Sequence, residues 1–474
     1  MKSKFLLSLL LIFTLFACQE NESPAKDMYF GGLIVNPTSK FVVLLKKDVV
    51  VDTFFLDETN RFGGRLIDAE KGLYVFKHPP ENQLTYLEPG DSTLVLLNTL
   101  EFDESLNFSG KGAEKSNYLN RMYLLNQENN NLILDYYKLG PLEFAEKTDS
   151  IRESRKKNLD KLNKRFKFST DFFDLANSSI NYEYYDLRER YAYLLRRYSR
   201  EEVRQLPSDF HKYREDISFD DEALEDYYVY LHFIDDLLRT KSLEYCERNN
   251  IEDDDCYDLA DHENIKRRII LADSLLLNPR IKNNFIDRLA AQGIVYSKSR
   301  EELISILQLL QEREYSGDKF EDLRQMAGIH NALLPGRNLG ELTLLKTQRD
   351  SIKINKISRK PKITYQWSMN SPSHYKWQQK KITNLREKYP EIDFIGINID
   401  KNHFGEWLDI LKKQGFDESF EYKLNILTIN EDLLKTYLNK LILLNPSGEI
   451  VRGDIRLTTL DHETKILEFL NSFY

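Results

Sequence analysis

The sequence contains few cysteines and no surplus of positive charge. Three cysteines occur in 474 residues, and none of them lies in a Cys-x-x-Cys spacing. Lysine and arginine total 67 against 76 aspartates and glutamates, so the net charge is −9. This balance argues against nucleic acid as a partner, because binding phosphates requires a concentrated basic surface. The hydrophobic fraction of 41% and the charged fraction of 30% are typical of a folded globular protein.

The apolar run near the N-terminus is too short to span a bilayer comfortably. It extends from Phe5 to Phe16, about a dozen residues, and follows the basic segment MKSK. A basic segment followed by such a run is typical of a signal peptide. The run ends in Leu15-Phe16-Ala17-Cys18, which resembles the lipobox of bacterial lipoproteins. The alternative is an ordinary secretory signal with a chance cysteine.

The lipobox resemblance implies that residues 1–17 are removed and that Cys18 is acylated, with residues 18–27 forming a polar tether. Three acyl chains, at roughly 0.8 kcal/mol per buried methylene, make a stable anchor. We therefore expect a cell-envelope protein held in the outer membrane by palmitate-type chains. Acidic residues after Cys18 resemble surface-export signals, so both a periplasm-facing and a surface-exposed orientation stay open.

The two other cysteines, Cys246 and Cys256, are ten residues apart. In an oxidising compartment they could form a structural disulfide worth on the order of 2–3 kcal/mol. The acidic run from Glu252 to Asp255 lies between them, but its spacing does not match an EF-hand loop, and we interpret it as a solvated loop. The histidines other than His374 show no HExxH or other metal-ligand spacing, so we expect no metal and no cofactor.

Residues 28–110 carry short apolar or alternating runs separated by turn residues, a pattern that predicts a small β-sandwich. The expected strands are 41–45, 49–51, 53–56, 73–76, 84–87 and 94–97. The expected turns are 57–60, Gly63-Gly64, Pro79-Pro80 and 89–91. Pro89 and Gly90 suit the two central positions of a type II turn.

Residues 111–332 are expected to form a helical domain. Only six glycines or prolines occur between Ala113 and Met326, and apolar residues recur at helical spacing. Ser169 has the pattern of a helix start, and Ser299 with Glu302 that of a capping box.

Residues 333–474 alternate strand and helix patterns. The expected order is strand 363–367, helix 374–388, strand 392–399, helix 404–413, strands 441–444 and 449–451, and helix 460–473. This is the order of the thioredoxin fold. The chain as a whole is therefore predicted to be multidomain α+β, with a β-sandwich, a helical middle region and a thioredoxin-like α/β domain.

Two parts of the sequence resemble known families. The segments GLYVF, LEPGDS and FSGKGAEKSNYL resemble a β-rich domain of unknown function that precedes thioredoxin-like domains in bacterial envelope lipoproteins. Residues 335–474 resemble the TlpA/ResA-like domain of membrane-anchored thiol-disulfide oxidoreductases, on the tryptophan Trp367, the strand YPEIDFIGINID and the hairpin LLNPSGEIV. In that family a Cys-x-x-Cys motif begins four residues after the tryptophan. Here Ser371 and His374 stand at the two cysteine positions, and by register Asn439 stands near the position of the family's cis-proline.

These departures predict that the thioredoxin-like domain is redox-inactive, because disulfide exchange needs an attacking thiolate and a resolving thiol. We expect Trp367 to be a core or groove aromatic and Ser371 to cap the helix. Ser371 and His374 share a helix face, but no carboxylate or oxyanion hole can be argued for a nucleophile–base pair. The expected function is binding or scaffolding of a protein or peptide partner. The alternative is an envelope enzyme related to thiol-disulfide oxidoreductases and acting in redox homeostasis.

Overall fold

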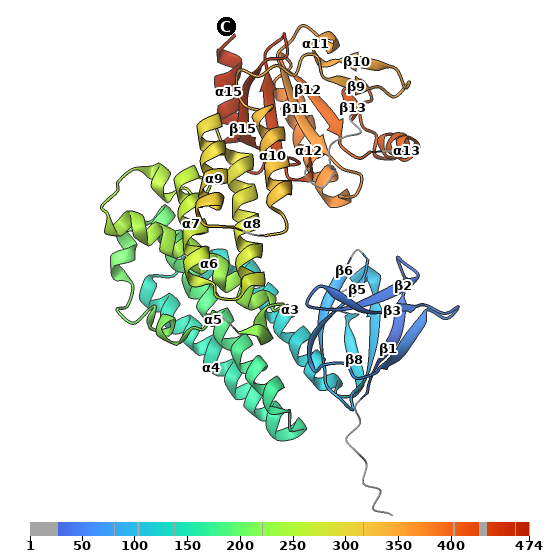
Figure 1. The fold of residues 1–474 in the computed structure, drawn as a ribbon, viewed down its shortest axis with the longest axis vertical. Coiled ribbons are helices and arrows are strands. Elements are labelled where there is room, and N and C mark those ends of the chain that lie inside the picture. Colours follow the sequence, from blue (N-terminus) through green and yellow to red (C-terminus); the bar gives the residue numbers. More distant parts are fainter. Residues whose placement is uncertain are drawn as a thin grey trace, which may run out of the picture. The chain divides into compact units, whose positions relative to one another are not determined.

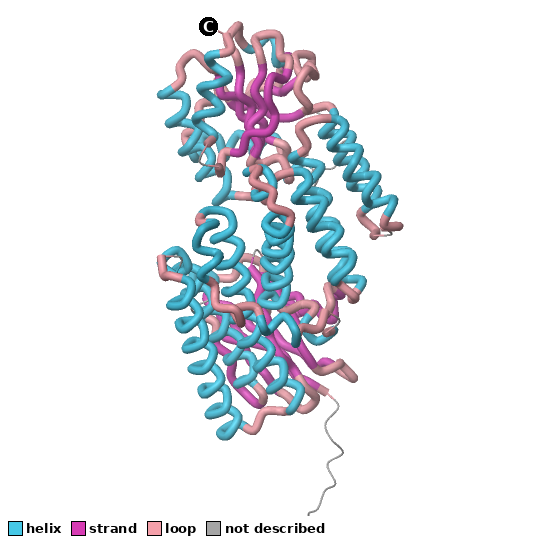
Figure 2. The backbone as a smooth tube through the Cα atoms, turned by 90° about the vertical axis from the view of Figure 1, so that its left-hand side faces the viewer, coloured by secondary structure: helices cyan, strands magenta, loops and turns pink. Residues whose placement is uncertain are grey.

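The computed structural model describes residues 27–79, 81–101, 105–136, 138–219, 221–315, 317–401, 403–425, 434–459 and 461–473. The predicted signal peptide and Cys18 lie outside these residues. The chain is mixed α/β (Figure 1, Figure 2). Its described residues divide into two compact units, one ending at Thr240 and one beginning at Lys241. Among the described residues, no helix is both long enough and apolar enough to cross a membrane.

Residues 28–111 form two four-stranded sheets, drawn in blue in Figure 1. The first has the order β4 (Arg61–Leu66), β1 (Met28–Val35), β7 (Ser92–Asn98), β8 (Asn107–Lys111). The second has the order β3 (Val49–Phe55), β2 (Phe41–Lys46), β5 (Gly72–His78), β6 (Glu81–Leu87). Apolar side chains of both sheets share one core, in which the ring of Phe30 lies 6.1 Å from that of Phe54 and 5.8 Å from that of Phe76. The arrangement is a β-sandwich.

Strands β1 and β4 were not expected from the sequence, and the predicted turn at Gly63-Gly64 is wrong. Both glycines lie inside β4, where Gly63 pairs with Gly31 of β1. A Cβ atom on Gly63 would come within 2.4 Å of the Tyr29 hydroxyl oxygen. Gly63 therefore makes room for the Tyr29 side chain and Gly64 for the Phe54 ring, rather than marking a turn.

The helices of the first unit follow the sandwich. They are α3 (Ala113–Tyr136), α4 (Pro141–Phe166), α5 (Thr170–Tyr198) and most of α6 (Tyr228–Arg248), which continues past the division at Thr240. Five short 3-10 helices occur in the described chain: η1 (Thr99–Glu101), η2 (Arg200–Gln205), η3 (Lys212–Asp216), η4 (Glu222–Leu224) and η5 (Asp254–Tyr257). Ser169 begins α5 as predicted, since its hydroxyl accepts a hydrogen bond from the Phe172 N–H at 3.3 Å.

The second unit contains four more helices before its sheet: α7 (His262–Leu275), α8 (Pro279–Tyr296), α9 (Arg300–Glu312) and α10 (Phe320–Asn331). The structure thus divides the predicted helical region between two units. At the start of α9, the Ser299 hydroxyl accepts from the Glu302 N–H at 3.2 Å, and the Glu302 carboxylate accepts from the Lys298 N–H at 2.6 Å. The capping residues predicted there do act as a cap, with the glutamate reaching one residue further back than in a capping box.

The sheet of the second unit has seven strands, with the order β10 (Ser351–Lys353), β9 (Thr343–Leu345), β13 (Glu421–Leu424), β12 (Asp393–Asn398), β11 (Lys362–Trp367), β14 (Lys440–Leu444), β15 (Ile450–Arg456). Its helices are α11 (Ile354–Ile357), α12 (Pro372–Lys388), α13 (Phe404–Gln414) and α15 (His462–Asn471). Strand β11 is parallel to β12 and antiparallel to β14, and β15 is antiparallel to β14. This strand order, with α12 between β11 and β12, is the thioredoxin arrangement, so the predicted fold of this region is confirmed.

Each face of this sheet has its own core. Ile363 and Leu443 face a cluster that includes Trp407 of α13 and Ile466 of α15. Ile395 and other alternate residues face a second cluster with β9 and α11. The alternation follows from the period of two along a strand. Both faces of the sheet are therefore covered.

Candidate functional site

The loop between β11 and α12 is fixed by a buried carboxylate. The Ser368 hydroxyl donates to Asp400 Oδ1 at 2.6 Å, and the Met369 N–H donates to Asp400 Oδ2 at 2.6 Å. Asn398 also donates to Asp400 Oδ2, at 2.8 Å. Hydrogen bonds to an ionised acceptor are stronger than neutral ones. The approach to α12 is therefore a defined surface and not a loose loop.

Ser371 lies at the N-cap position of α12, but its side chain does not cap the helix. Its carbonyl accepts the first helical bond from the Tyr375 N–H at 3.0 Å, whereas its hydroxyl bonds no helical N–H. Its ψ of 68° departs from the extended value that serves capping, such as the 154° of Ser169. The expected side-chain cap is thus absent, and the hydroxyl stands at a partly exposed helix N-terminus.

The structure brings together His374 and Asn439, which are 65 residues apart in sequence. The His374 Nε2 donates to Asn439 Oδ1 at 2.9 Å. Because the amide oxygen can only accept, Nε2 is the donor in this bond. Among the described residues, His374 Nδ1 has no hydrogen-bond partner. A hydrogen bond therefore joins the position of the resembled family's second cysteine to a residue near the position of its cis-proline.

Gln378 holds this pair in place from the interior. Its Nε2 donates to the carbonyl oxygens of Gln366 at 3.1 Å and Leu438 at 2.8 Å, so α12 is tied to the residues before β14. The Asn439 carbonyl accepts from the Leu457 N–H at 3.0 Å. The fixed backbone leaves the Asn439 side chain exposed.

The groups at the surface are polar with one aromatic ring. The Trp377 ring lies 5.7 Å from the His374 ring. The Lys381 ammonium lies 4.9 Å from the centre of the Trp377 ring. Trp377 is partly exposed, and Ser373 is exposed. We refer to Ser371, Ser373, His374, Trp377 and Asn439 together as the α12 surface.

Trp367 belongs to the core and not to the α12 surface. Its side chain is 0% exposed, and its Nε1 donates to Glu421 Oε2 at 2.9 Å. Its rings lie edge-on to those of Tyr375 at 5.7 Å and Phe416 at 6.0 Å. The sequence predicted that Trp367 is either a core residue or a groove residue, and in the structure it is a core residue.

Glu421 is a buried residue that sequence reasoning missed. Its carboxylate accepts from the Tyr365 hydroxyl and from Gln379 Nε2 at 2.8 Å, and Arg386 Nη2 lies 3.7 Å away. Burial raises the pKa of Glu421, although these hydrogen bonds and the guanidinium oppose the rise. Burial likewise raises the pKa of Tyr365. The sequence EYKL around it carries no apolar run that could have indicated a buried strand.

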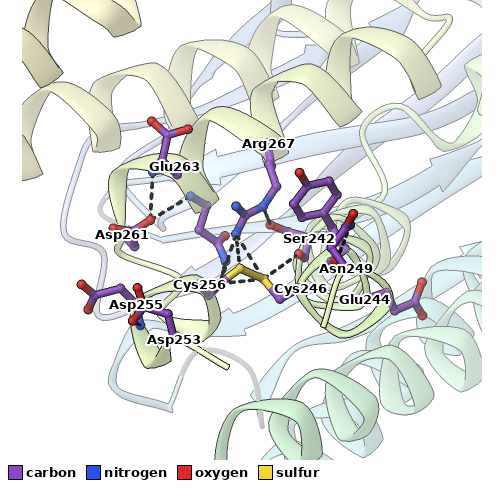
Figure 3. The surroundings of a disulfide bond; sticks show 12 residues. Ser242, Glu244, Cys246, Asn249, Asp253, Asp255, Cys256, Asp261, Glu263 and Arg267 are labelled. Carbon is purple, nitrogen blue, oxygen red and sulfur yellow. Dashed lines mark hydrogen bonds between the residues drawn. A yellow bond between two sulfur atoms is a disulfide. The ribbon is translucent and has the colours of Figure 1, made fainter. Parts of the chain in front are cut away.

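Cys246 and Cys256 form a disulfide between the end of α6 and η5 (Figure 3). The Arg267 guanidinium of α7 points at the bond: its Nη2 lies 3.4 Å from each sulfur and donates to the Cys256 carbonyl at 3.1 Å. Burial lowers the pKa of Arg267. Both cysteines are buried, and the acidic residues from Glu252 to Asp255 between them are exposed.

The fold and this site define residues 343–471 as a thioredoxin-like domain with no cysteine at the start of α12. No family model and no curated protein matches the sequence.

Solved structures of thioredoxin-like proteins are similar to part of this chain. They include the thioredoxin domain of a thiol-disulfide oxidoreductase from Bacteroides vulgatus, with 18% identity and a TM-score of 0.23 over 29% of this chain and 99% of that one. A thiol:disulfide interchange protein from Bacteroides sp. has 18% identity and a TM-score of 0.22 over 30% and 92%. A thioredoxin-like protein from Bacteroides caccae has 14% identity and a TM-score of 0.31 over 60% and 94%. The assignment of the fold rests on the strand order described above.

Proposed function

We propose that this protein is a lipid-anchored protein of the cell envelope whose thioredoxin-like domain binds an extended protein or peptide segment at the α12 surface, without disulfide exchange. The observation that carries the proposal is the hydrogen bond between His374 and Asn439. It occupies the place where a redox domain would hold a thiol against a proline. Two polar side chains that hydrogen-bond to each other there, each with further polar atoms to offer, suit recognition better than electron transfer.

The chemistry of the α12 surface supports binding. A hydroxyl at position 371 and an imidazole at position 374 cannot form the mixed disulfide that exchange requires. The Asn439 amide still has its two N–H donors, and the Trp377 ring offers apolar area beside them. Polar groups that fix orientation next to an aromatic anchor are a common composition of peptide-binding surfaces.

Absence of redox turnover is the first test. The full chain is expected to show no activity above background in insulin-reduction and scrambled-disulfide assays. Turnover that persists in the Cys246→Ser/Cys256→Ser double variant would contradict the proposal. Cys18 is the one cysteine left in that variant, so the activity could not come from the Cys246–Cys256 disulfide.

Binding is tested with a reduced and carboxymethylated, permanently unfolded polypeptide as the probe. His374→Ala and Asn439→Ala are each expected to weaken its binding about tenfold, which corresponds to roughly 1.4 kcal/mol. His403→Ala is the matched control, since His403 is an exposed histidine of the same domain that pairs with Glu406 at 3.4 Å. Equal affinities for wild type, His374→Ala and Asn439→Ala would place binding elsewhere.

The lipid anchor is tested by labelling cells with radioactive palmitate. The wild type is expected to incorporate label and Cys18→Ala to lose it, whereas Cys246→Ala/Cys256→Ala keeps it. Label that persists in Cys18→Ala would rule out Cys18 as the acylated residue.

An envelope enzyme of thiol-disulfide redox homeostasis is the second candidate, and the Arg267 contact favours it. A guanidinium 3.4 Å from both sulfurs would stabilise a thiolate released from the disulfide. Under this second hypothesis, Cys246 and Cys256 undergo thiol-disulfide exchange with cysteines of a partner protein. Turnover in the same assays that is lost in Cys246→Ser/Cys256→Ser would establish this candidate in place of the first.

A further inference from the structure

The first sheet of the sandwich has one face in the core and one face open to solvent. Strand pairing places alternate residues of its four strands in register, for example Leu33 beside Arg61 on one side and Leu96 on the other. The outward residues are Arg61, Gly63 and Arg65 of β4; Tyr29, Gly31, Leu33 and Val35 of β1; Ser92, Leu94, Leu96 and Asn98 of β7; and Asn107, Ser109 and Lys111 of β8. We call this set the outer face of the β1 sheet.

The middle of the outer face is apolar although it is exposed. Leu94 is 41% exposed, Leu96 48% and Val35 38%. The Tyr29 side chain lies along the same face, because a Cβ atom on Gly31 would come within 3.1 Å of its ring and one on Gly63 within 2.4 Å of its hydroxyl oxygen. Contiguous exposed apolar side chains on a folded domain mark an interaction site.

The charges of the outer face are all positive. Arg61, Arg65 and Lys111 are exposed, and no carboxylate occurs among the outward residues of this sheet, in a chain with net charge −9. Arg61 lies next to Asp57, whose side chain accepts from the Arg61 N–H at 2.9 Å. Within the described part of the chain, Arg65 and Lys111 take part in no ion pair. The surface therefore suits an anionic partner with an apolar layer.

The outer face is close in sequence to the predicted anchor. β1 begins at Met28, and the first row of the face at that end is Arg65, Tyr29, Ser92 and Lys111. Met28 is ten positions after Cys18, with nine residues between them. Such a segment reaches at most about 36 Å when extended and about 16–19 Å as a flexible coil. A protein held by Cys18 would thus keep this end of the sheet near the lipid headgroups.

We propose that the outer face of the β1 sheet rests on the membrane surface. Leu94 and Leu96 enter the boundary between headgroups and acyl chains, while Arg65 and Lys111 pair with the phosphates of anionic phospholipids. The proposal shares with the proposed function only the anchor at Cys18. It adds a second membrane signal that orients the sandwich.

Vesicle co-sedimentation tests the face without the anchor. The protein used begins at Gln19 and so keeps every described residue. It is expected to bind vesicles of phosphatidylcholine and phosphatidylglycerol more strongly than vesicles of phosphatidylcholine alone, and to lose binding as salt rises. Leu94→Ser/Leu96→Ser and Arg65→Ser/Lys111→Ser are each expected to reduce binding about tenfold. All four side chains are exposed, so far-UV circular dichroism should show an unchanged fold.

Matched controls come from α4 of the same unit. Leu142 is 63% exposed, and Lys157 and Lys161 are exposed one turn apart. Leu142→Ser and Lys157→Ser/Lys161→Ser should bind like wild type. Unchanged binding in the outer-face variants, or a loss confined to the α4 variants, would overturn the proposal. Binding of the unfolded polypeptide to the same protein is measured separately, so a negative vesicle result leaves the proposed function standing.

Discussion

Single side chains of the thioredoxin-like domain have two kinds of role. Trp367 and Glu421 are buried and bonded to each other, so they hold the strands beneath α12. His374 and Asn439 are bonded to each other at the surface, where they shape what a partner meets. A substitution in the first pair should change stability, and one in the second should change binding.

Glu421→Gln is expected to change how the stability of this domain depends on pH. Because burial raises its pKa, folded Glu421 holds its proton at pH values where the unfolded chain, with a pKa of about 4.3, has released it. The free energy of unfolding of the wild type therefore falls as pH rises from about 4.3 through the raised pKa, and then levels off. Glutamine does not ionise, so the variant should lack this fall.

Tryptophan fluorescence measures this effect, since Trp367, Trp377 and Trp407 are all the tryptophans of the chain and all lie in the domain. Denaturant unfolding followed in this way at several pH values gives the comparison. Glu418→Gln, at an exposed glutamate three residues earlier, should leave the wild-type profile unchanged. If the free energy of unfolding depends on pH in the same way for wild type and Glu421→Gln, the pKa of Glu421 is not raised by burial.

At the scale of elements, the sequence predicted those whose apolar pattern is regular. β11, α12, β12, α13, the β14–β15 hairpin and α15 all lie where the strand and helix periods placed them. β1 and β4 were missed. In β4 the pair Gly63-Gly64 was interpreted as a turn, although these glycines make room for the side chains of Tyr29 and Phe54. β13 was missed because buried Glu421 and Lys423 interrupt its apolar pattern, and only the folded chain supplies their partners.

The candidate site could be predicted in part. The register placed Asn439 near the start of a strand, and the motif placed His374 at the start of a helix. Their hydrogen bond could not be predicted, because it depends on how β11 and β14 pair across more than sixty intervening residues. The absence of a side-chain cap at Ser371 could not be predicted either, because it depends on the ψ angle of that residue, which is 68°.

The disulfide joins the end of α6 to η5, and its removal should destabilise this part of the chain. The bond between Cys246 and Cys256 closes a loop of about eleven residues, for which loop-closure entropy predicts a loss of about 3 kcal/mol. Cys246→Ser/Cys256→Ser should lower the midpoint of denaturant unfolding, and a reducing agent should lower it in wild type by a similar amount. The same agent should leave the double variant unaffected. A variant as stable as the oxidised wild type would show that the loop is held without the bond.

At the scale of the whole molecule, each of the two units has a hydrophobic core of its own. Phe76, 0% exposed, lies in the core of the sandwich, and Ile363, also 0% exposed, lies in that of the thioredoxin-like sheet. Separate cores predict separate unfolding transitions, because two-state behaviour belongs to single domains. Phe76→Ala should destabilise the first unit by about 3–5 kcal/mol and Ile363→Ala the second by about 2–5 kcal/mol, each leaving the other unit as stable as in wild type.

Hydrogen exchange resolved by peptide measures both units in one experiment. In Phe76→Ala, exchange should rise in peptides from residues 41–98 and stay at the wild-type level in peptides from 362–398, and Ile363→Ala should show the reverse pattern. Helix α6 runs across the division at Thr240, so it could couple the two transitions. If either variant raises exchange in both sets of peptides, the two units do not unfold independently.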